Sequence, residues 1–188
     1  KKKEIILLTN EQAKKVLAEA KKISIQRWLQ TLIALNTGLR IDGVISMMKS
    51  DIHWQDNEIK RIVKGGKEVI IPLTKELRDG LIYYFNKTNY HSRCVFPKSD
   101  DFSRPMTTSS IKWVKSIAKR IGVENWEKFR FHDFRHYFAT EFLRRTGDIK
   151  ALQDILGHED LETTSIYLHI LGKHKKDAMK RFEEAGYA

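Results

Sequence analysis

Residues Leu156–Tyr167 read L-G-H-E-D-L-E-T-T-S-I-Y, and they predict both a helix boundary and the position of a reactive group. An apolar helical pattern over Ile149–Leu156 precedes Gly157, which is expected to end that helix as a C-terminal cap. A second helical pattern then carries Tyr167, which lies nine positions after His158. A phenol that follows an imidazole in this way is a candidate nucleophile.

Composition indicates a folded domain whose partner is a polyanion. The 188 residues suffice for one domain with a sizeable core, and 41% hydrophobic with 31% charged residues is typical of globular proteins. Lys and Arg number 35 against 24 Asp and Glu, which gives a net charge of +11. Such an excess favours nucleic acid, because each neutralised phosphate releases a condensed counterion. Basic proteins without such a partner also exist, so charge alone assigns no reaction.

Cysteine usage and hydropathy indicate the compartment. Cys94 is the single cysteine, so an internal disulfide is excluded and a buried structural thiol in a reducing interior is expected. No apolar run approaches the roughly 18 residues of a membrane helix, and no apolar signal core follows Lys1-Lys2-Lys3. These features predict a cytoplasmic protein with no membrane partner.

Local patterns predict a fold of the α+β class that is mainly helical, with one small three-stranded antiparallel sheet. Thr9 and Gln12 form a capping box that begins a first helix, and a second helix over Ile25–Asn36 ends at Thr37-Gly38. The strands are expected over Asp51–Trp54, Glu58–Lys64 and Val69–Pro72, with turns at Gln55-Asp56-Asn57 and Gly65-Gly66.

The remaining segments are predicted to be helices and one loop. The expected helices are a short one through Val44, Ile45 and Met47; one capped by Thr74; one capped by Thr107, Thr108 or Ser109; Asp133–Arg145; Ile149–Leu156 with Asp148 as cap; one starting at Leu161; and a basic tail helix over Lys173–Ala185. Lys87–Met106 is expected to be a loop. No repeat or linker interrupts the chain, so residues 1–188 are predicted to form a single domain.

Basic side chains near element ends suggest an anion site. Arg40 follows a glycine turn, where a guanidinium can be held rigidly and offered to two oxygens. His132 and Arg135 are three positions apart at the start of a helix, where free N–H groups favour an anion. Lys64 ends a strand beside two glycines, so its ammonium can reach from a hairpin tip into DNA. Two arginines are therefore expected to clamp a phosphate while Lys64 protonates a leaving oxygen.

Each of these residues also has an ordinary interpretation, as a surface or salt-bridge cation. His132 and His136 have the spacing of a zinc pair, but Asp133 stands where the H-E-x-x-H motif needs Glu, and Arg135 would repel a cation. No metal site is therefore expected. The segment Lys64–Lys67 lacks the spacing of a P-loop, so no nucleotide cofactor is expected either.

Four blocks occur in a fixed order: T-G-L-R at 37–40, K-G-G-K-E at 64–68, H-D-F-R-H-Y-F-A-T at 132–140 and L-G-H-E-D-L-E-T-T-S-I-Y-L-H at 156–169. From about Leu7 to its end, the chain resembles the catalytic domain of the tyrosine recombinases, the phage integrase family. By this resemblance the catalytic set falls on Arg40, Lys64, His132, Arg135, His158 and Tyr167.

The resemblance implies the DNA breaking-rejoining fold and a site-specific recombinase or integrase that acts on double-stranded DNA. Tyr167 would attack the scissile phosphate and form a 3′-phosphotyrosyl intermediate, without ATP, metal or another cofactor. Arg40 and Arg135 would clamp that phosphate, His158 would donate to it, His132 would act as general base, and Lys64 would protonate the 5′ oxygen.

The resemblance also implies partners and a further domain. Family members act in a synaptic tetramer, in which the C-terminal helix either docks on a neighbouring protomer or stays on its own molecule. An N-terminal DNA-binding domain is expected to precede this chain, which lacks an initiating Met. Family members often carry an acidic residue three positions after the first arginine, whereas Gly43 stands there and Asp42 precedes it. Carboxylate support of Arg40 is therefore open.

Three other functions fit parts of the sequence. A type IB topoisomerase has a similar nucleophile and clamp, but the block from L-G-H to Tyr167 favours a recombinase. A non-catalytic DNA-binding module would be expected to have lost a catalytic residue type, and all six are present. A helix-turn-helix repressor would leave Arg40 and Lys64 unexplained. The target site and the type of recombination stay open.

Overall fold

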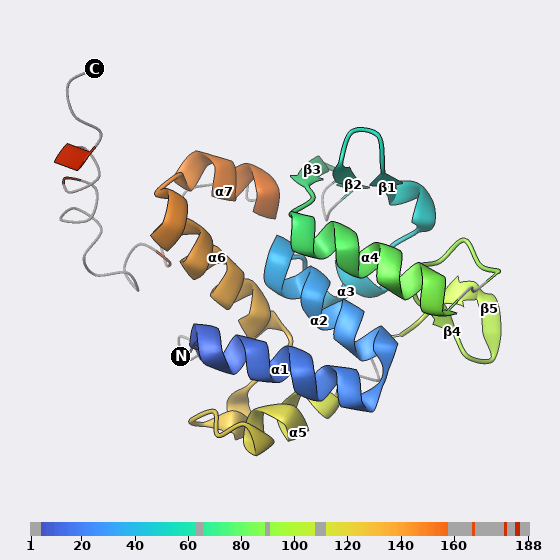
Figure 1. The fold of residues 1–188 in the computed structure, drawn as a ribbon, viewed down its shortest axis with the longest axis horizontal. Coiled ribbons are helices and arrows are strands. Elements are labelled where there is room, and N and C mark those ends of the chain that lie inside the picture. The colour runs from blue at the N-terminus through green and yellow to red at the C-terminus, as the bar shows by residue number, and fades with distance from the viewer. Residues whose placement is uncertain are drawn as a thin grey trace.

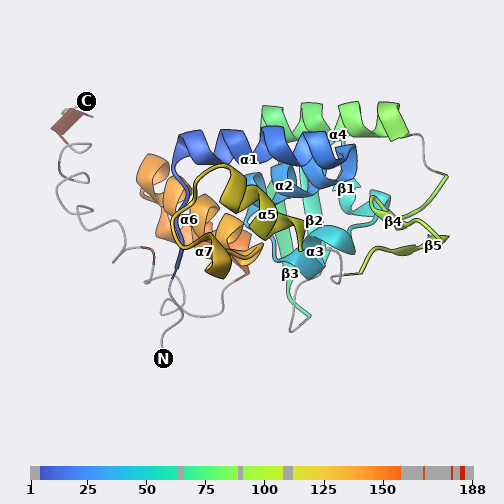
Figure 2. The same cartoon turned by 90° about the horizontal axis from the view of Figure 1, so that it is seen from below.

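The computed structural model describes residues 5–62, 66–88, 91–107 and 112–157, together with positions 167, 179, 183 and 184. Helices α1 (Asn10–Ile23) and α4 (Lys75–Thr88) form one side of the molecule in Figure 2, and α3 (Ile41–Ile45), α5 (Trp113–Arg120) and α7 (Ile149–Leu156) lie on the other. The mainly helical architecture predicted from the sequence is confirmed. None of the described helices is both long and apolar enough to cross a membrane.

Helix α2 (Ile25–Thr37) is the centre of the fold. It packs against α1, α4 and α6 (His132–Thr146), and it runs between them in Figure 1. Its apolar side chains are buried around most of its circumference, as expected for a helix that is surrounded by others. Two buried threonines bond within the helix, with Thr31 Oγ1 donating to the carbonyl of Arg27 at 2.9 Å and Thr37 Oγ1 to that of Ile33 at 2.7 Å.

Side-chain caps set the ends of the first two helices. The predicted capping box is present, because Thr9 Oγ1 accepts from the Gln12 amide at 3.1 Å and Gln12 Oε1 accepts from the Thr9 amide at 3.0 Å. Ser24 ends α1 and caps α2 by accepting from the Arg27 amide. Gly38 ends α2 in the left-handed conformation, with φ of 65°. A side-chain cap at a helix N-terminus, such as that of Thr9 or Ser24, contributes about 1 kcal/mol.

The predicted three-stranded antiparallel sheet is also confirmed, in the order β1 (Ile52–His53), β2 (Glu58–Ile62) and β3 (Glu68–Pro72). Ile59 of β2 pairs with Ile71 of β3, and both side chains are buried. Strand β1 is shorter than expected. The last residues of the predicted strand Glu58–Lys64 lie outside the described residues.

One expectation was wrong. The segment Lys87–Met106 is not simply a loop, because α4 extends to Thr88 and β4 (Pro97–Lys98) pairs with β5 (Asp101–Pro105). Prolines in both short strands remove the usual strand signal, so the pairing is not visible in the sequence. The described part of helix α5 begins at Trp113, and the Arg27 guanidinium packs over the Trp113 ring at 5.6 Å. Thr108 and Ser109, two of the three caps expected for this helix, lie outside the described residues.

The described part of the chain contains two further 3₁₀ turns, η1 (Lys49–Asp51) and η3 (Trp126–Lys128). Cys94 is buried, as predicted. It forms an isolated antiparallel β-bridge with Met48, which follows α3 in the chain. The helix expected from Leu161 and the tail helix fall almost entirely outside the described residues.

Replacement of Gly38 by alanine is expected to destabilise the fold. A Cβ at this position would lie 2.6 Å from Leu156 Cδ2 and from Phe138 Cδ1, in addition to the backbone cost of a positive φ. The free energy of unfolding in urea should fall by about 2–4 kcal/mol. Gly122→Ala is the matched control, because Gly122 also has a positive φ but a Cβ added there would meet no atom within 4 Å. Equal losses for the two variants would contradict the packing argument.

Candidate active site

Arg135 lies at the junction of three helices. Its side chain projects from α6 and is buried, with 3% of the residue exposed. Nη1 donates to the carbonyl of Gly38 at 2.8 Å, and Nη2 donates to the carbonyl of Leu156 at 3.0 Å. These carbonyls end α2 and α7, where the last turn of a helix lacks internal donors and carries partial negative charge. One guanidinium therefore fastens two helix ends to α6.

Arg40 supplies a second positive charge nearby. It follows the Gly38 turn, occupies the N-cap position of α3 without a capping side-chain bond, and is exposed. Burial, with the charge of Arg40 next in importance, lowers the pKa of Arg135 to about 10. Both arginines line a pocket of about 240 Å³, whose walls are Leu39, Arg40, Asp42, Gly43, Ser46, Arg61, Ile62, Arg135 and Leu156. The predicted pair of arginines is thus brought to one pocket, which Asp42 also lines.

Tyr167 is the described residue that completes this constellation. The residue is 3% exposed and packs with the apolar cluster of α6 and α7 that includes Phe138 and Leu152. Burial raises the pKa of the Tyr167 phenol, whereas the charge of Arg135, a hydrogen bond with it and the charge of Arg40 act to lower that pKa. The phenol therefore interacts with both guanidinium groups of the predicted clamp.

His136 is the residue that sequence reasoning missed in this role. Its Nδ1 lies 3.1 Å from the Tyr167 hydroxyl, and the two rings are 5.6 Å apart. Burial, followed by the nearby charges of His132, Arg130 and Arg135, lowers the pKa of His136 to about 4. At neutral pH the imidazole is uncharged, so Nδ1 can accept the phenolic proton in a hydrogen bond. The spacing of His136 from His132 suggested only a metal pair.

His136 is a poor base for Tyr167 in this arrangement. Burial raises the pKa of the Tyr167 phenol and lowers the pKa of His136 to about 4, so proton transfer from the phenol to this imidazole is strongly unfavourable. The His132 ring packs edge-on against His136, with centroids 4.7 Å apart. The His136 ring thus lies between the His132 imidazole and the Tyr167 phenol. His132 is half-buried, whereas His136 is buried.

Buried Asp133 fixes the start of α6. Its Oδ2 accepts from the Arg130 amide at 2.6 Å. Burial raises the pKa of Asp133, although this bond and the charge of Arg130 act to lower it. The residue therefore fixes the turn that leads into the helix of His132 and Arg135.

Four of the six predicted site residues can be placed. Arg40, Arg135 and Tyr167 interact with one another, and His132 reaches the group through His136. Lys64 and His158 lie outside the described residues.

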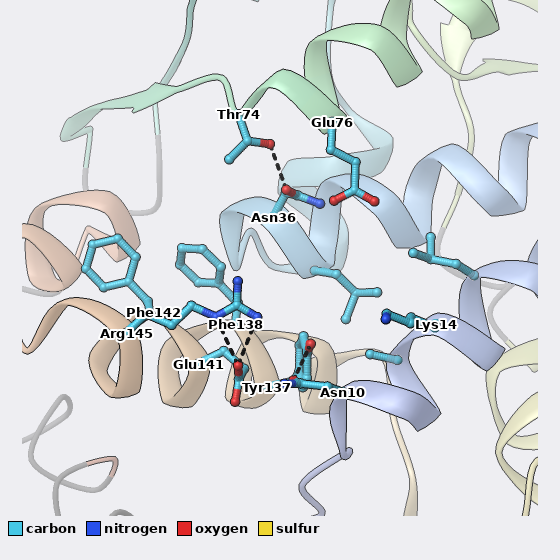
Figure 3. A pocket seen from close by; sticks show the side chains of 13 residues that line it. Asn10, Lys14, Asn36, Thr74, Glu76, Tyr137, Phe138, Glu141, Phe142 and Arg145 are labelled. Carbon is cyan, nitrogen blue, oxygen red and sulfur yellow. Dashed lines mark hydrogen bonds and ion pairs between the residues drawn. The ribbon is translucent and has the colours of Figure 1, made fainter.

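A larger cavity, of about 390 Å³, lies between α1, α2, α4 and α6, and Figure 3 shows its lining. Several polar groups on its walls bond to one another: Tyr137 donates to Asn10, Thr74 to Asn36, and Arg145 pairs with Glu141. Among the described residues, none of the predicted catalytic set lines it. The size of a pocket therefore does not locate the candidate site, because Arg40 and Arg135 line the smaller pocket.

Residues 7–174 match the phage integrase family. The chain belongs to this family. It is 32% identical over 175 residues to the tyrosine recombinase XerA of Pyrococcus furiosus, which covers 93% of this chain and 60% of that protein. It is 34% identical over 165 residues to the tyrosine recombinase XerD of Listeria innocua serovar 6a, with 84% of this chain and 54% of that protein covered. This phage integrase family member thus spans little more than half the length of these relatives.

Solved structures of the family share its fold. The XerA recombinase crystal structure matches with a TM-score of 0.76 and 25% identity, over 94% of this chain and 65% of the other. The catalytic domain of bacteriophage HP1 integrase matches with a TM-score of 0.67 and 23% identity, over 94% of this chain and 95% of that one. The predicted tyrosine recombinase fold is therefore confirmed.

The contact between His136 and Tyr167 predicts energetic coupling. His136→Phe keeps a ring but removes the acceptor, so a buried hydroxyl loses its partner at a cost of about 1–3 kcal/mol. In a Tyr167→Phe background the same change should cost about 1 kcal/mol less. Urea unfolding of the four proteins in this double-mutant cycle measures the coupling. Additive losses would mean that the two side chains do not bond in solution.

The depressed pKa of His136 predicts acid sensitivity. The unfolded state binds a proton near pH 6.5 and the folded state only near pH 4, so this residue's contribution to stability falls as pH is lowered between these values. Buried Asp133, whose pKa is raised, acts in the opposite direction and is present in both proteins compared. The stability difference between the unmodified chain and His136→Phe should therefore shrink from pH 7 to pH 4. A constant difference would contradict the shift.

Proposed function

We propose that this chain is the catalytic domain of a site-specific DNA recombinase, which breaks and rejoins strands through a covalent bond between DNA and Tyr167. The observation that carries the proposal is the interaction of a buried phenol with two guanidinium groups, Arg135 and Arg40. Membership of the phage integrase family supports the same reaction. The family relatives named XerA and XerD are tyrosine recombinases.

The pocket of the two arginines suits a phosphodiester. Attack on phosphorus increases negative charge on the non-bridging oxygens, and fixed cations stabilise this charge more in the transition state than in the ground state. Arg40 is exposed and can meet the incoming phosphate, while Arg135 is held by the carbonyls of Gly38 and Leu156. Arg135 is thus preorganised, and Arg40 supplies the accessible donor.

The phenol is held protonated until DNA arrives. Burial and the hydrogen bond to neutral His136 both favour the uncharged form of Tyr167. His136 orients the hydroxyl, and His132 is proposed as the base that removes its proton, since the pKa of His136 is too low. His158 is proposed to donate to the phosphate, and Lys64 to protonate the departing 5′ oxygen.

The energetics require no cofactor. Attack by the Tyr167 oxygen forms one P–O bond and breaks another, so a phosphodiester is exchanged for a phosphotyrosyl diester. The 5′ hydroxyl of another strand can then reverse the step at the phosphotyrosine and release the phenol. The bond energy is conserved throughout, and neither ATP nor a metal ion is needed to balance the reaction.

The proposed partners follow from the number of DNA strands that must be broken. Each chain contributes one Tyr167, whereas strand exchange between two duplexes breaks four strands. A tetramer on DNA is therefore proposed, with the C-terminal segment as the element that contacts a neighbouring protomer. Double-stranded DNA is the proposed substrate, as suggested by the net charge of +11 and by the DNA in the fold-related complex of XerH with its difH substrate. A location in the cytoplasm with the nucleoid is part of the same proposal.

Formation of a covalent adduct tests the proposal. The chain is incubated with a pool of nicked suicide duplexes whose sequence is randomised around the nick, without added metal. We expect a protein–DNA band that survives SDS, carries a 3′ linkage and disappears in Tyr167→Phe, because that variant lacks the nucleophilic oxygen. Denaturing gels measure the adduct as a fraction of total DNA.

Tyr137→Phe is the matched control. Tyr137 is on α6 and also loses a hydroxyl bond, to Asn10, but it lies away from the arginine pocket and should leave the adduct unchanged. DNA binding without any adduct would overturn the proposal in favour of a non-catalytic binding module. Adducts that only relax supercoiled DNA and never join two duplexes would indicate a topoisomerase.

A further inference from the structure

Strand β2 carries an arginine on the face where its neighbours are apolar. Ile59 is fully buried, and Val69 and Ile71 on the paired strand are 1% and 2% exposed. Arg61 lies two positions after Ile59 and opposite Val69, so it points to the same face, and its side chain is 12% exposed. A guanidinium this buried is stable only with partners that match its charge and donors.

The partners of Arg61 belong to one short segment. Its Nη1 forms an ion pair with Asp51, and its Nη2 donates to Ser46 Oγ at 2.7 Å. Nη1 also lies 3.4 Å from the Ser46 carbonyl. Asp51 accepts in addition from the Met48 amide at 2.8 Å. The guanidinium therefore ties β2 to the stretch of chain between Ser46 and Asp51.

Arg40 and Ser46 stand at opposite ends of the same short helix, α3. Helix α3 has five residues, with Arg40 as its N-cap and Ser46 as its C-cap. Ser46 Oγ donates to the Asp42 carbonyl at 2.5 Å while it accepts from Arg61. A helix this short has few internal bonds, so contacts at its ends determine where it lies. The cation Arg61 at its C-terminus also suits the helix dipole.

We propose that Arg61 is a positioning residue for the phosphate clamp, because it fixes α3 against β2 and so holds Arg40 in the pocket that Arg135 also lines. This inference rests on the proposed function. Arg61 itself lines the pocket, but its charge is offset by Asp51, and a phosphate would have to compete with that carboxylate. Arg40, by contrast, has no hydrogen bond or ion pair within the described part of the chain and is exposed. Arg40 is therefore the phosphate ligand, and Arg61 acts through it.

The test separates the rate of cleavage from the affinity for DNA. Arg61→Met keeps the length of the side chain and removes its charge and donors. In single-turnover assays on the nicked duplex pool, we expect the adduct rate at saturating protein to fall by at least about tenfold, as for a displaced catalytic group. The half-saturating protein concentration should stay within about twofold, because the interaction lost is internal.

Arg78→Met is the matched control. Arg78 also donates to a backbone carbonyl, that of Trp54, and to the side chain of Asn57, but it does not line the arginine pocket. Its adduct rate should stay within about twofold of the unmodified chain. Equal slowing by Arg78→Met and Arg61→Met would mean a general loss of stability and would overturn the inference.

Asp51→Asn provides a second variant if Arg61→Met fails to fold. It keeps the shape of the carboxylate and removes the charge that orients Arg61. We expect a smaller fall in rate with unchanged half-saturation, and the double variant should be no slower than Arg61→Met, because both changes break the same link.

Three further outcomes would overturn the inference. A rise in half-saturation, with unchanged maximal rate and a salt slope reduced by about one, would make Arg61 a phosphate ligand instead. An adduct rate unchanged in both Arg61→Met and Asp51→Asn would remove any role for Arg61 and leave the proposed function intact. Absence of an adduct from the unmodified chain would overturn the proposed function and this inference with it.

Discussion

The Arg135 guanidinium is the interaction on which the rest of the site depends. It donates to the last carbonyls of two helices, at Gly38 and Leu156, and it bonds the Tyr167 phenol. Because these carbonyls end α2 and α7, one side chain ties the ends of both helices to α6. Arg40, which follows Gly38 after a single residue, takes its position from this junction. The clamp is therefore built into the way in which the helices pack.

Burial makes this arrangement chemically selective. The pKa of Arg135 falls to about 10, which leaves the guanidinium charged at neutral pH, while the pKa of His136 falls to about 4, which leaves the imidazole neutral. The phenol of Tyr167 is consequently protonated in the resting protein and bonded on one side to a neutral acceptor. Entry of a phosphate between the arginines would change the balance of charge around this phenol.

A second layer of contacts supports the exposed arginine. Asp42, the residue before Gly43, lines the pocket together with Arg40, so a carboxylate residue is present at this wall although Gly43 has none. The link from Arg61 through Ser46 and Asp51 joins the sheet to α3. Each arginine of the pocket thus has a different environment: Arg135 is enclosed by carbonyls, Arg61 is paired with a carboxylate and Arg40 faces solvent.

The sequence by itself determined the elements with strong local signals and the identity of the reactive groups. Neighbours in the chain determine the Thr9 capping box, the helix ends at Gly38 and Gly157, and the alternation around Ile59. The spacing of the motifs pointed to Arg40, Arg135 and Tyr167. Only the tertiary structure decided the partners. The bond of His136 to Tyr167, the inward place of Arg61 and the β4–β5 pair depend on residues far apart in sequence or on weak strand signals, because burial and charge pairing act through space.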